Sequence, residues 1–321
     1  MKKNILITGG CGFIGSNLTS HFLSEGNRVI VIDDLSVGKK NNLKRHKNLI
    51  FIKKKIQEIS KIKINQKIDV CIHLAAKAEI LINKVKEDQY FDDNVVGLQN
   101  VLKFCSQKKI EKFIFASSAS VYGDTKNLNV KENFALRPLH YYAYSKFLGE
   151  KMVENYSKIN GLKYYILRFF NVYGPNSNAV VARFLSQYLQ KKKITIYGNG
   201  EQSRDFINIR DIYEAIKKIT EKKIGSNIFN LGSSKSLKIK ELKDLISVNA
   251  DFINLDKRFD DIEVSIADIK KAKKILKWKP KVSFKKGLDE MKKKDHYRLY
   301  NLKLDSINQQ KKLILKFNKK S

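Results

Sequence analysis

The chain has 321 residues, of which 42% are hydrophobic and 30% are charged. This is enough for one large α/β domain and a smaller one, and the composition is that of a globular rather than a disordered protein. Lys and Arg number 64 against 32 Asp and Glu, a net charge of +32. The excess is mostly lysine spread along the whole length, without a zinc-finger, RNA-recognition or helix-turn-helix signature. We therefore expect solvated surfaces rather than a nucleic-acid partner.

Three cysteines, Cys11, Cys71 and Cys105, cannot all pair with one another and form no C-x-x-C motif. This favours a reduced, cytoplasmic protein without a metal site. The basic start is followed by an apolar run of only residues 5–7, and no stretch is long enough to span a bilayer. We expect neither a secretory signal nor a membrane partner.

Short apolar runs separate longer amphipathic segments in the first half of the chain. Such runs are typical of parallel strands buried on both faces and joined by crossover helices. Two of the intervening segments, 94–108 and 142–158, carry apolar residues at helical spacing. The sequence predicts a Rossmann-type doubly wound parallel sheet over 1–170, with strands at 5–7, 29–32, 50–52, 70–72, 113–115 and 165–167.

The second half is more mixed, with glycine-containing turns at 174–175, 198–200 and 232–234. We expect a smaller C-terminal α/β substrate-binding domain there. Residues 295–321 form a Lys-rich extension, which predicts a solvated helix and a frayed tail. The expected domain limits are 171–204 and 233–294 for the substrate-binding domain, with a segment around 205–232 returning to the first domain.

A glycine-rich turn, TGGCGFIG, follows the first predicted strand, and Gly9, Gly12 and Gly15 form G-x-x-G-x-x-G in it. A turn without Cβ atoms lets the backbone approach a pyrophosphate, and the following helix offers free N–H groups at its positive end. Asp33 lies eighteen positions after Gly15, where a carboxylate accepts hydrogen bonds from a ribose and repels a 2′-phosphate. The pattern predicts an NAD site and disfavours NADP; the alternative is a structural turn.

A proton-transfer group is predicted from Ser118, after the fifth strand, and from Tyr142 with Lys146 further along. A helix starting near Tyr142 places Lys146 on the same face. A tyrosine base at neutral pH needs its pKa lowered by about 3 units, which an ammonium and a positive nicotinamide ring can supply. Tyr141 and Tyr144 have no lysine at the fourth following position. The Y-x-x-x-K pair is common by chance, so its weight comes from its place after the dinucleotide motif.

Together these motifs resemble those of an extended short-chain dehydrogenase/reductase of the NAD-dependent epimerase/dehydratase family, over about residues 2–291. The similarity is greatest to the UDP-glucose and UDP-N-acetylglucosamine 4-epimerases. Matching stretches include TGGCGFIG (8–15), HLAA (73–76), SSASVYG (117–123), RFFNVYGP (168–175) and IYGNGEQSRDFI (196–207).

The resemblance implies a role for each matching position. Ser118 and Tyr142 would handle the proton, and the protein would be a homodimer formed through the helices beginning near Asn94 and Tyr142. The NAD contacts would be Gly9, Gly12, Phe13, Ile14, Gly15, Asp33, Asn94, Tyr142 and Lys146. The UDP-sugar contacts would be Ser118, Asn171, Tyr197, Arg204, Arg258 and Ser265, with the two arginines clamping the diphosphate.

The residues after Ser118 bear on the reaction. Dehydratases of the family resemble Thr-Asp-Glu at this place and decarboxylases keep a glutamate, whereas this chain has Ala119 and Ser120. The resemblance therefore implies 4-epimerisation through a transient 4-keto sugar, with NAD unchanged overall. Other sugar-nucleotide epimerases, a dehydratase or reductase, and a catalytically silent NAD-binding protein are the alternatives.

Ser265 stands at the position that is small in relatives accepting an N-acetyl group. This implies UDP-GlcNAc/UDP-GalNAc as substrates, with UDP-Glc/UDP-Gal also accepted and UDP-glucuronate left open. Three positions depart from the family pattern. Lys55 replaces an Asp near the adenine, Cys11 replaces a small loop residue, and Asp260 replaces a Gly beside Arg258.

Overall fold

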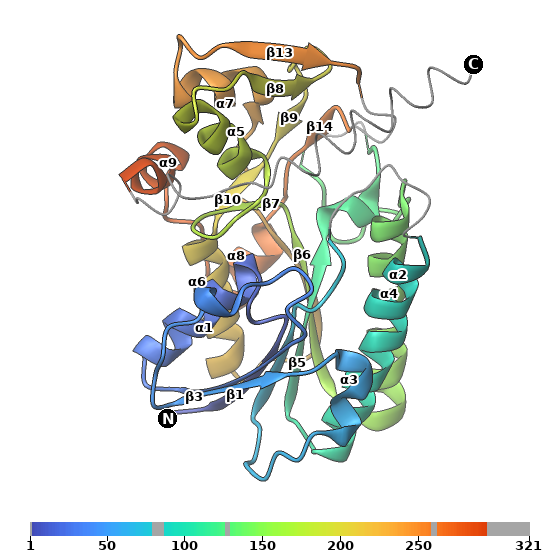
Figure 1. Cartoon of the computed structure of the whole chain (residues 1–321). Coiled ribbons are helices and arrows are strands. Elements are labelled where there is room, and N and C mark those ends of the chain that lie inside the picture. The colour runs from blue at the N-terminus through green and yellow to red at the C-terminus, as the bar shows by residue number, and fades with distance from the viewer. Residues whose placement is uncertain (1, 79–86, 126–128, 258–261, 294–321) are drawn as a thin grey trace, which may run out of the picture.

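A computed structural model of the chain describes residues 2–78, 87–125, 129–257 and 262–293. Its centre is a seven-stranded sheet in which every neighbouring pair is parallel (Figure 1). From edge to edge the strands are β3 (Leu49–Lys53), β2 (Arg28–Asp33), β1 (Asn4–Thr8), β4 (Val70–His73), β5 (Lys112–Ser118), β6 (Lys163–Phe169) and β11 (Asn227–Leu231). The order 3-2-1-4-5-6 is that of the doubly wound dinucleotide fold, which confirms the predicted fold class.

Helices cover both faces of this sheet (Figure 1). Alternate residues of β1 show the arrangement: Ile5 and Ile7 pack with one set of helices and Leu6 with the other. The first set is α1 (Phe13–Ser24), α6 (Ile209–Glu221) and α8 (Lys270–Leu276), and the second is α3 (Gly97–Gln107) and α4 (Tyr141–Asn160). All six predicted strands are present.

Two expectations about these elements were wrong in detail. β3 is an edge strand whose Ile50 is 36% exposed, so it is not buried on both faces. The connections on either side of β3 contain only short 3₁₀ turns, η1 (Lys40–Asn42) and η2 (Ile56–Lys61), in place of crossover helices. The segment 94–108 is helical as far as Gln107, as its apolar spacing predicts. It begins in the π-helical turn η4 (Asp92–Val96), which follows α2 (Glu87–Phe91) and precedes α3.

The second half of the chain builds a separate group of short strands above the sheet (Figure 1). They enclose a third hydrophobic core with α5 (Val180–Leu189), α7 (Ile239–Ile246) and α9 (Phe284–Lys293). The pairs are β7 (Asn171–Tyr173) with β10 (Phe206–Asn208), and β8 (Ile194–Tyr197) with β13 (Phe252–Leu255). A third sheet has β9 (Ser203–Arg204) between β12 (Leu237–Lys238) and β14 (Val264–Ser265).

The chain crosses between the two regions more than once. After β9 it passes through β10 and α6 into β11, which pairs with β6 at the edge of the large sheet. Ala267, Ile269 and Trp278, within the predicted substrate-binding limits, pack in the same core as α1 and α6. The precise domain limits stay a prediction.

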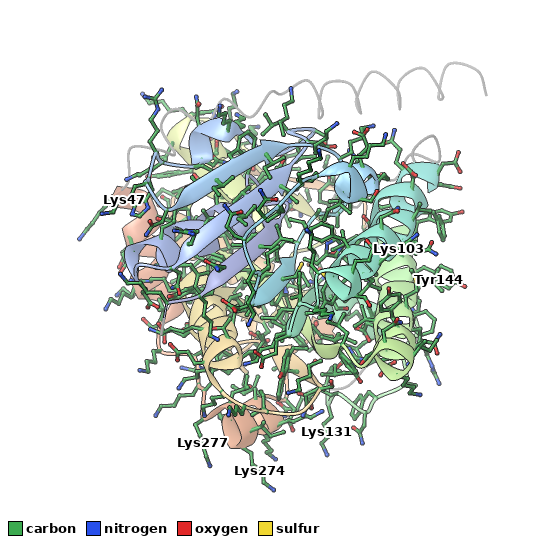
Figure 2. The ribbon with its side chains drawn as sticks, turned by 90° about the horizontal axis from the view of Figure 1, so that it is seen from below. Lys47, Lys103, Lys131, Tyr144, Lys274 and Lys277 are labelled. Atoms are coloured by element: carbon green, nitrogen blue, oxygen red, sulfur yellow. The ribbon has the colours of Figure 1, made fainter. Side chains whose placement is uncertain are left out.

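The lysine side chains are not gathered on one face of the molecule. Lys47, Lys103, Lys131, Lys274 and Lys277 project outward from different parts of the ribbon (Figure 2). Within the described ranges, no helix is long and apolar enough to cross a membrane. Nor do these ranges contain three or more His, Cys, Asp or Glu side chains grouped to hold a metal ion.

Candidate active site

The glycine-rich turn joins β1 to α1 and has no room for side chains. Gly9 has a φ of +70°, and a Cβ atom there would lie 2.6 Å from the backbone nitrogen of Ala75. A Cβ on Gly15 would collide with the carbonyl of Gly9. Gly12 caps α1 without a side-chain hydrogen bond, so the first N–H groups of the helix stay available to an anion. This cradle fits a dinucleotide diphosphate, as predicted for Gly9, Gly12, Phe13, Ile14 and Gly15.

Asp33 ends β2 and is 7% exposed. Its Oδ2 accepts a hydrogen bond from the N–H of Cys11 at 2.8 Å, and its Oδ1 accepts one from the N–H of Leu35 at 2.8 Å. Burial raises the pKa of Asp33, and these two hydrogen bonds oppose the rise. The carboxylate therefore holds the glycine turn in place and keeps lone pairs for ribose hydroxyls.

One of the positions that depart from the family pattern lies in this turn, and a second follows β3. Cys11 is fully buried, and its pKa is raised to about 12 by burial and by Asp33, so it remains a thiol. Its backbone carbonyl accepts a hydrogen bond from Asn42 Nδ2 at 2.8 Å. Lys55 is exposed and immediately precedes η2. Its effect on adenine binding stays a prediction.

The catalytic candidates meet where β5 ends and α4 begins. Ser118 is the last residue of β5, and its side chain lies close enough to the phenol of Tyr142 to lower the pKa of that phenol. Lys146 Nζ lies 5.9 Å from the centre of the Tyr142 ring and donates to the carbonyl of Ala116 at 2.8 Å. The Oγ of Ser118 also accepts from the N–H and the Oγ of Ser120, at 3.2 and 2.9 Å. The structure thus brings the three predicted residues together.

The charges of this pair differ from the expectation. Burial raises the pKa of Tyr142 to about 12, opposed by the hydrogen bond with Ser118. Burial also lowers the pKa of Lys146 to about 7, opposed by the charge of Glu150. Burial therefore disfavours the charged form of each of these two side chains. A bound nicotinamide ring, being positively charged, would lower the Tyr142 pKa towards the value that a phenolate base requires.

Asn94 supports the start of α4 from the π-helical turn η4. Its Oδ1 accepts from the N–H of Lys77 at 2.8 Å, and its Nδ2 donates to the carbonyl of Lys77 at 3.0 Å and to Ser145 Oγ at 2.9 Å. Ser145 Oγ in turn donates to the carbonyl of Tyr142 at 2.8 Å. Both amide protons of Asn94 are used in this way, so its contact with a cofactor is restricted to Oδ1.

Three of the predicted substrate residues gather around Asp205. Ser265 on β14 pairs with Arg204 on β9, and its carbonyl accepts from the N–H of Asp205 at 3.0 Å. Asn171 on β7 donates from its N–H to the carbonyl of Asp205 at 2.9 Å. The guanidinium of Arg204 donates from Nη1 to the carbonyls of Ser203 and Ile262. Arg204 therefore braces β9, and its role as a diphosphate clamp stays a prediction.

The remaining predicted substrate residues are less constrained. Tyr197 ends β8, with its ring centre 5.9 Å from the guanidinium of Arg183. Arg258 lies outside the described residues, as do Asp260 and the whole Lys-rich extension at 295–321.

His73 and His140 were missing from the sequence prediction. His73 ends β4 opposite Thr8, with Nδ1 2.7 Å from Thr8 Oγ1 and its ring stacked against Phe113 and Phe115. Burial, with a contribution from Lys146, lowers its pKa to about 3, so it is neutral. His140 caps α4 through Ala143 N–H and stacks on Tyr142, with ring centres 6.0 Å apart. The sequence offered only their positions as a signal for these two residues. His73 directly follows a predicted strand, and His140 precedes a predicted helix.

Glu150, Arg168 and Asp205 were also missing, and all three are charged residues with 3% exposure or less. For Arg168 a signal existed, since it interrupts an otherwise apolar strand. For Glu150 the spacing of four residues from Lys146 was a signal. Asp205 gave none, because its partners are distant in the sequence.

A sequence profile of the NAD dependent epimerase/dehydratase family matches residues 5–232. The chain belongs to this family. A relative, the putative UDP-glucose 4-epimerase of Methanocaldococcus jannaschii, is 35% identical over 296 residues, covering 88% of this chain and 95% of the relative. The family assignment agrees with the glycine cradle and with Asp33, and its cofactor is NAD.

Solved structures of other epimerases have the same architecture. The UDP-N-acetylglucosamine 4-epimerase of Methanobrevibacter ruminantium, in complex with UDP-N-acetylmuramic acid, superposes with a TM-score of 0.83. It is 35% identical, covering 91% of this chain and 98% of that one. The UDP-glucuronic acid 4-epimerase of Bacillus cereus, solved with UDP-glucuronic acid and NAD, has a TM-score of 0.84 at 29% identity, covering 92% and 99%. The chain is thus a nucleotide-sugar enzyme of the epimerase/dehydratase type.

Proposed function

We propose that this enzyme interconverts UDP-sugars that differ in configuration at C4, using tightly held NAD. The observation that carries the proposal is the group of Ser118, Tyr142 and Lys146 at the carboxyl edge of the sheet, with no carboxylate at positions 119 and 120. Redox chemistry at one carbon needs only a proton acceptor and a hydride acceptor. Elimination of water needs an additional acid, which this turn lacks.

Each residue of the group has a task in this reaction. Tyr142, as phenolate, would take the proton of the C4 hydroxyl and later return one to the C4 ketone. Ser118 would hold the same oxygen, since its hydroxyl already faces the Tyr142 phenol. Lys146, anchored on the carbonyl of Ala116, would keep Tyr142 oriented. Bound NAD supplies the hydride-accepting ring and a positive charge that lowers the pKa of Tyr142.

For the substrate we propose UDP-GlcNAc and UDP-GalNAc, with UDP-Glc and UDP-Gal also accepted. Ser265 supports this choice, because it is small and only partly buried beside Arg204. The similarity to a UDP-N-acetylglucosamine 4-epimerase at 35% identity supports it as well. A Ser265→Tyr variant should lose turnover of the N-acetylated sugars and retain turnover of the others. Unchanged N-acetyl turnover in that variant would show that Ser265 does not set the choice.

The proposal is tested by incubating the purified protein separately with UDP-GlcNAc and UDP-Glc, without added reductant, and resolving the C4 epimers. We expect both mixtures to approach an equilibrium of epimers, with UDP-GlcNAc converted. No conversion of any UDP-sugar by protein that contains NAD would instead indicate a silent NAD-binding protein.

We also propose that the enzyme works in the cytoplasm as a homodimer formed through α4 and its neighbours. Val96, Tyr141 and Tyr144 are 45%, 47% and 45% exposed on this face, and Figure 2 shows Tyr144 projecting away from α4. Exposed aromatic side chains of this kind mark protein interfaces. The three cysteines are unpaired, as expected in a reducing compartment. Light scattering should give about twice the chain mass of 37.1 kDa, and Tyr144→Glu should lower it.

A further inference from the structure

Behind the catalytic group lies a carboxylate that has no task in the mechanism above. Glu150 is completely buried on α4, one turn after Lys146 and two turns after Tyr142. It therefore lies on the same face of the helix as both residues. A buried carboxylate has a high cost unless its oxygens are fully paired.

Arg168 on β6 supplies that pairing. Its Nε and Nη2 donate to the two carboxylate oxygens of Glu150 at 2.9 and 2.7 Å, in the two-pronged geometry that fixes both planes. Arg168 Nη1 reaches further, donating to Tyr122 OH at 2.8 Å and to the carbonyl of Glu132 at 2.9 Å. One guanidinium thus joins α4 and β6 to the chain that follows β5.

The same carboxylate also holds β5 directly. Ser117 pairs with Arg168 across β5 and β6, which places the two side chains next to each other. Ser117 Oγ donates to Glu150 Oε1 at 2.5 Å. Ser118 therefore lies between Ser117, which is bonded to Glu150, and the turn η5 (Ala119–Tyr122), whose last residue is bonded to Arg168.

We propose that Glu150 is a positioning residue: with Arg168 it fixes the chain on both sides of Ser118 and thereby sets the distance between Ser118 and Tyr142. This inference rests on the proposed function, since it concerns the same site. Ser118 stands on a strand and Tyr142 on a helix, and no hydrogen bond between their backbones fixes one against the other. The Glu150 carboxylate connects these two elements through Ser117, one helical turn beyond the bond that Lys146 makes to the carbonyl of Ala116.

Stability alone does not account for this arrangement. A buried ion pair is commonly no more stabilising than apolar side chains of similar volume. What it adds is a fixed geometry, and general acid-base catalysis requires the donor and acceptor to stay within hydrogen-bond reach. A displacement of about 1 Å at the reacting groups can cost about 10²-fold in rate.

The test uses Ser117→Ala, which removes one hydroxyl and leaves the buried ion pair intact. The matched control is Ser186→Ala, which removes a hydroxyl from another buried serine, on α5, that accepts a hydrogen bond from Gln190. Ser117→Thr keeps the hydroxyl and serves as the rescue. Glu150→Gln is made in parallel. If that variant does not fold, the test of the positioning role rests on Ser117→Ala.

Two measurements are made on the NAD-loaded proteins. The first is kcat and KM for the UDP-sugar. The second is the ionisation of Tyr142, obtained as the difference in phenolate absorbance between each protein and the same protein carrying Tyr142→Phe. In Ser117→Ala we expect kcat to fall about tenfold with KM and NAD content unchanged, and the Tyr142 titration to move to higher pH, because the hydrogen bond from Ser118 lowers that pKa. Ser186→Ala and Ser117→Thr should match the unmodified protein.

A Ser117→Ala protein with normal kcat and a normal Tyr142 titration would overturn the positioning role, and so would a loss of thermal stability alone. Failure of the proposed function looks different. In that case the unmodified protein converts no UDP-sugar, while the Tyr142 titration still shows whether Ser117 and Glu150 position the phenol.

Discussion

The cofactor side and the sugar side of this enzyme each contain a buried aspartate that accepts hydrogen bonds from backbone N–H groups. The strands around the two aspartates differ. On the cofactor side, the strands have four to seven residues and lie in one parallel sheet, and Asp33 bonds to residues within 22 positions of it. On the sugar side, the strands have two to four residues in three small sheets. There Asp205 accepts from Ser233, Ser234 and Ala267, at separations of 28 to 62 positions.

This difference indicates how far substitutions can alter the shape of each binding site. The glycine cradle is backbone held by a continuous sheet, so it offers one geometry to one cofactor. The sugar side depends on a few long-range hydrogen bonds between short strands, so substitutions there can alter the pocket without disturbing the sheet. The relatives agree, since one fold serves epimerases and decarboxylases of different UDP-sugars.

The largest effect should come from Tyr142, which stands between the two sides. Tyr142→Phe removes the proton acceptor and should lower kcat by about 10³-fold, with NAD content and UDP affinity unchanged. Tyr144→Phe, two residues further along α4 and on its exposed face, is the control and should retain full activity. Steady-state kinetics and calorimetry with UDP measure both. Equal losses in the two variants would place the base elsewhere.

Asp205→Asn should act on the sugar side alone. The amide directs N–H groups toward backbone N–H donors, so the tie that the carboxylate makes between the 232–234 loop and Ala267, two residues after Ser265, is broken. UDP affinity, measured by calorimetry, should fall about 30-fold with unchanged NAD content, which corresponds to about 2 kcal/mol. A parallel loss of NAD would show that the two sides are one unit.

Asp33→Asn should produce the opposite pattern with a smaller effect. Only one of the two N–H groups, that of Cys11 or that of Leu35, loses its acceptor, because the amide keeps one oxygen, and a ribose contact is weakened. We expect NAD affinity to fall about tenfold, with less discrimination against NADP, while UDP affinity of the NAD-saturated protein is retained. Fluorescence titration with both dinucleotides measures this. An equal loss of UDP affinity would contradict the separation of the sides.

The smallest effect concerns Lys146 and the pH dependence of stability. Its pKa is about 7 in the folded chain against an ordinary value of 10.5. Between these pH values the unfolded chain holds more protons, so this residue makes stability rise with pH from about 7 towards 10.5. The free energy of unfolding of the NAD-free protein, minus that of Lys146→Met, should rise by about 1 kcal/mol per pH unit between pH 7.5 and 9.5. A constant difference would mean that the folded-state pKa is not lowered.

The parts of the molecule that the sequence could predict are those set by neighbouring residues. β1, the glycine turn, α1, β2 and Asp33 form within 30 residues, and each step has its own local cause. The meeting of Ser118 with Tyr142 and Lys146 was also predictable, because parallel strands end at the same edge of the sheet.

What the sequence could not predict depends on contacts between distant segments. β3 has an ordinary strand pattern, and only its place at the edge leaves Ile50 exposed. The lowered pKa of Lys146 follows from complete burial, which no local pattern of residues indicates. Asp205 resembles any exposed aspartate until Ser233, Ser234 and Ala267 surround it.

The most direct test of epimerisation follows one hydrogen atom. UDP-GlcNAc labelled with deuterium at C4 is incubated with the enzyme in ordinary water, and the products are analysed by mass spectrometry together with absorbance at the nicotinamide band. We predict the C4 epimer with unchanged mass, the deuterium retained at C4 and no net change in nicotinamide absorbance. A product that has lost water, or that has exchanged its deuterium for solvent hydrogen, would contradict the proposed reaction.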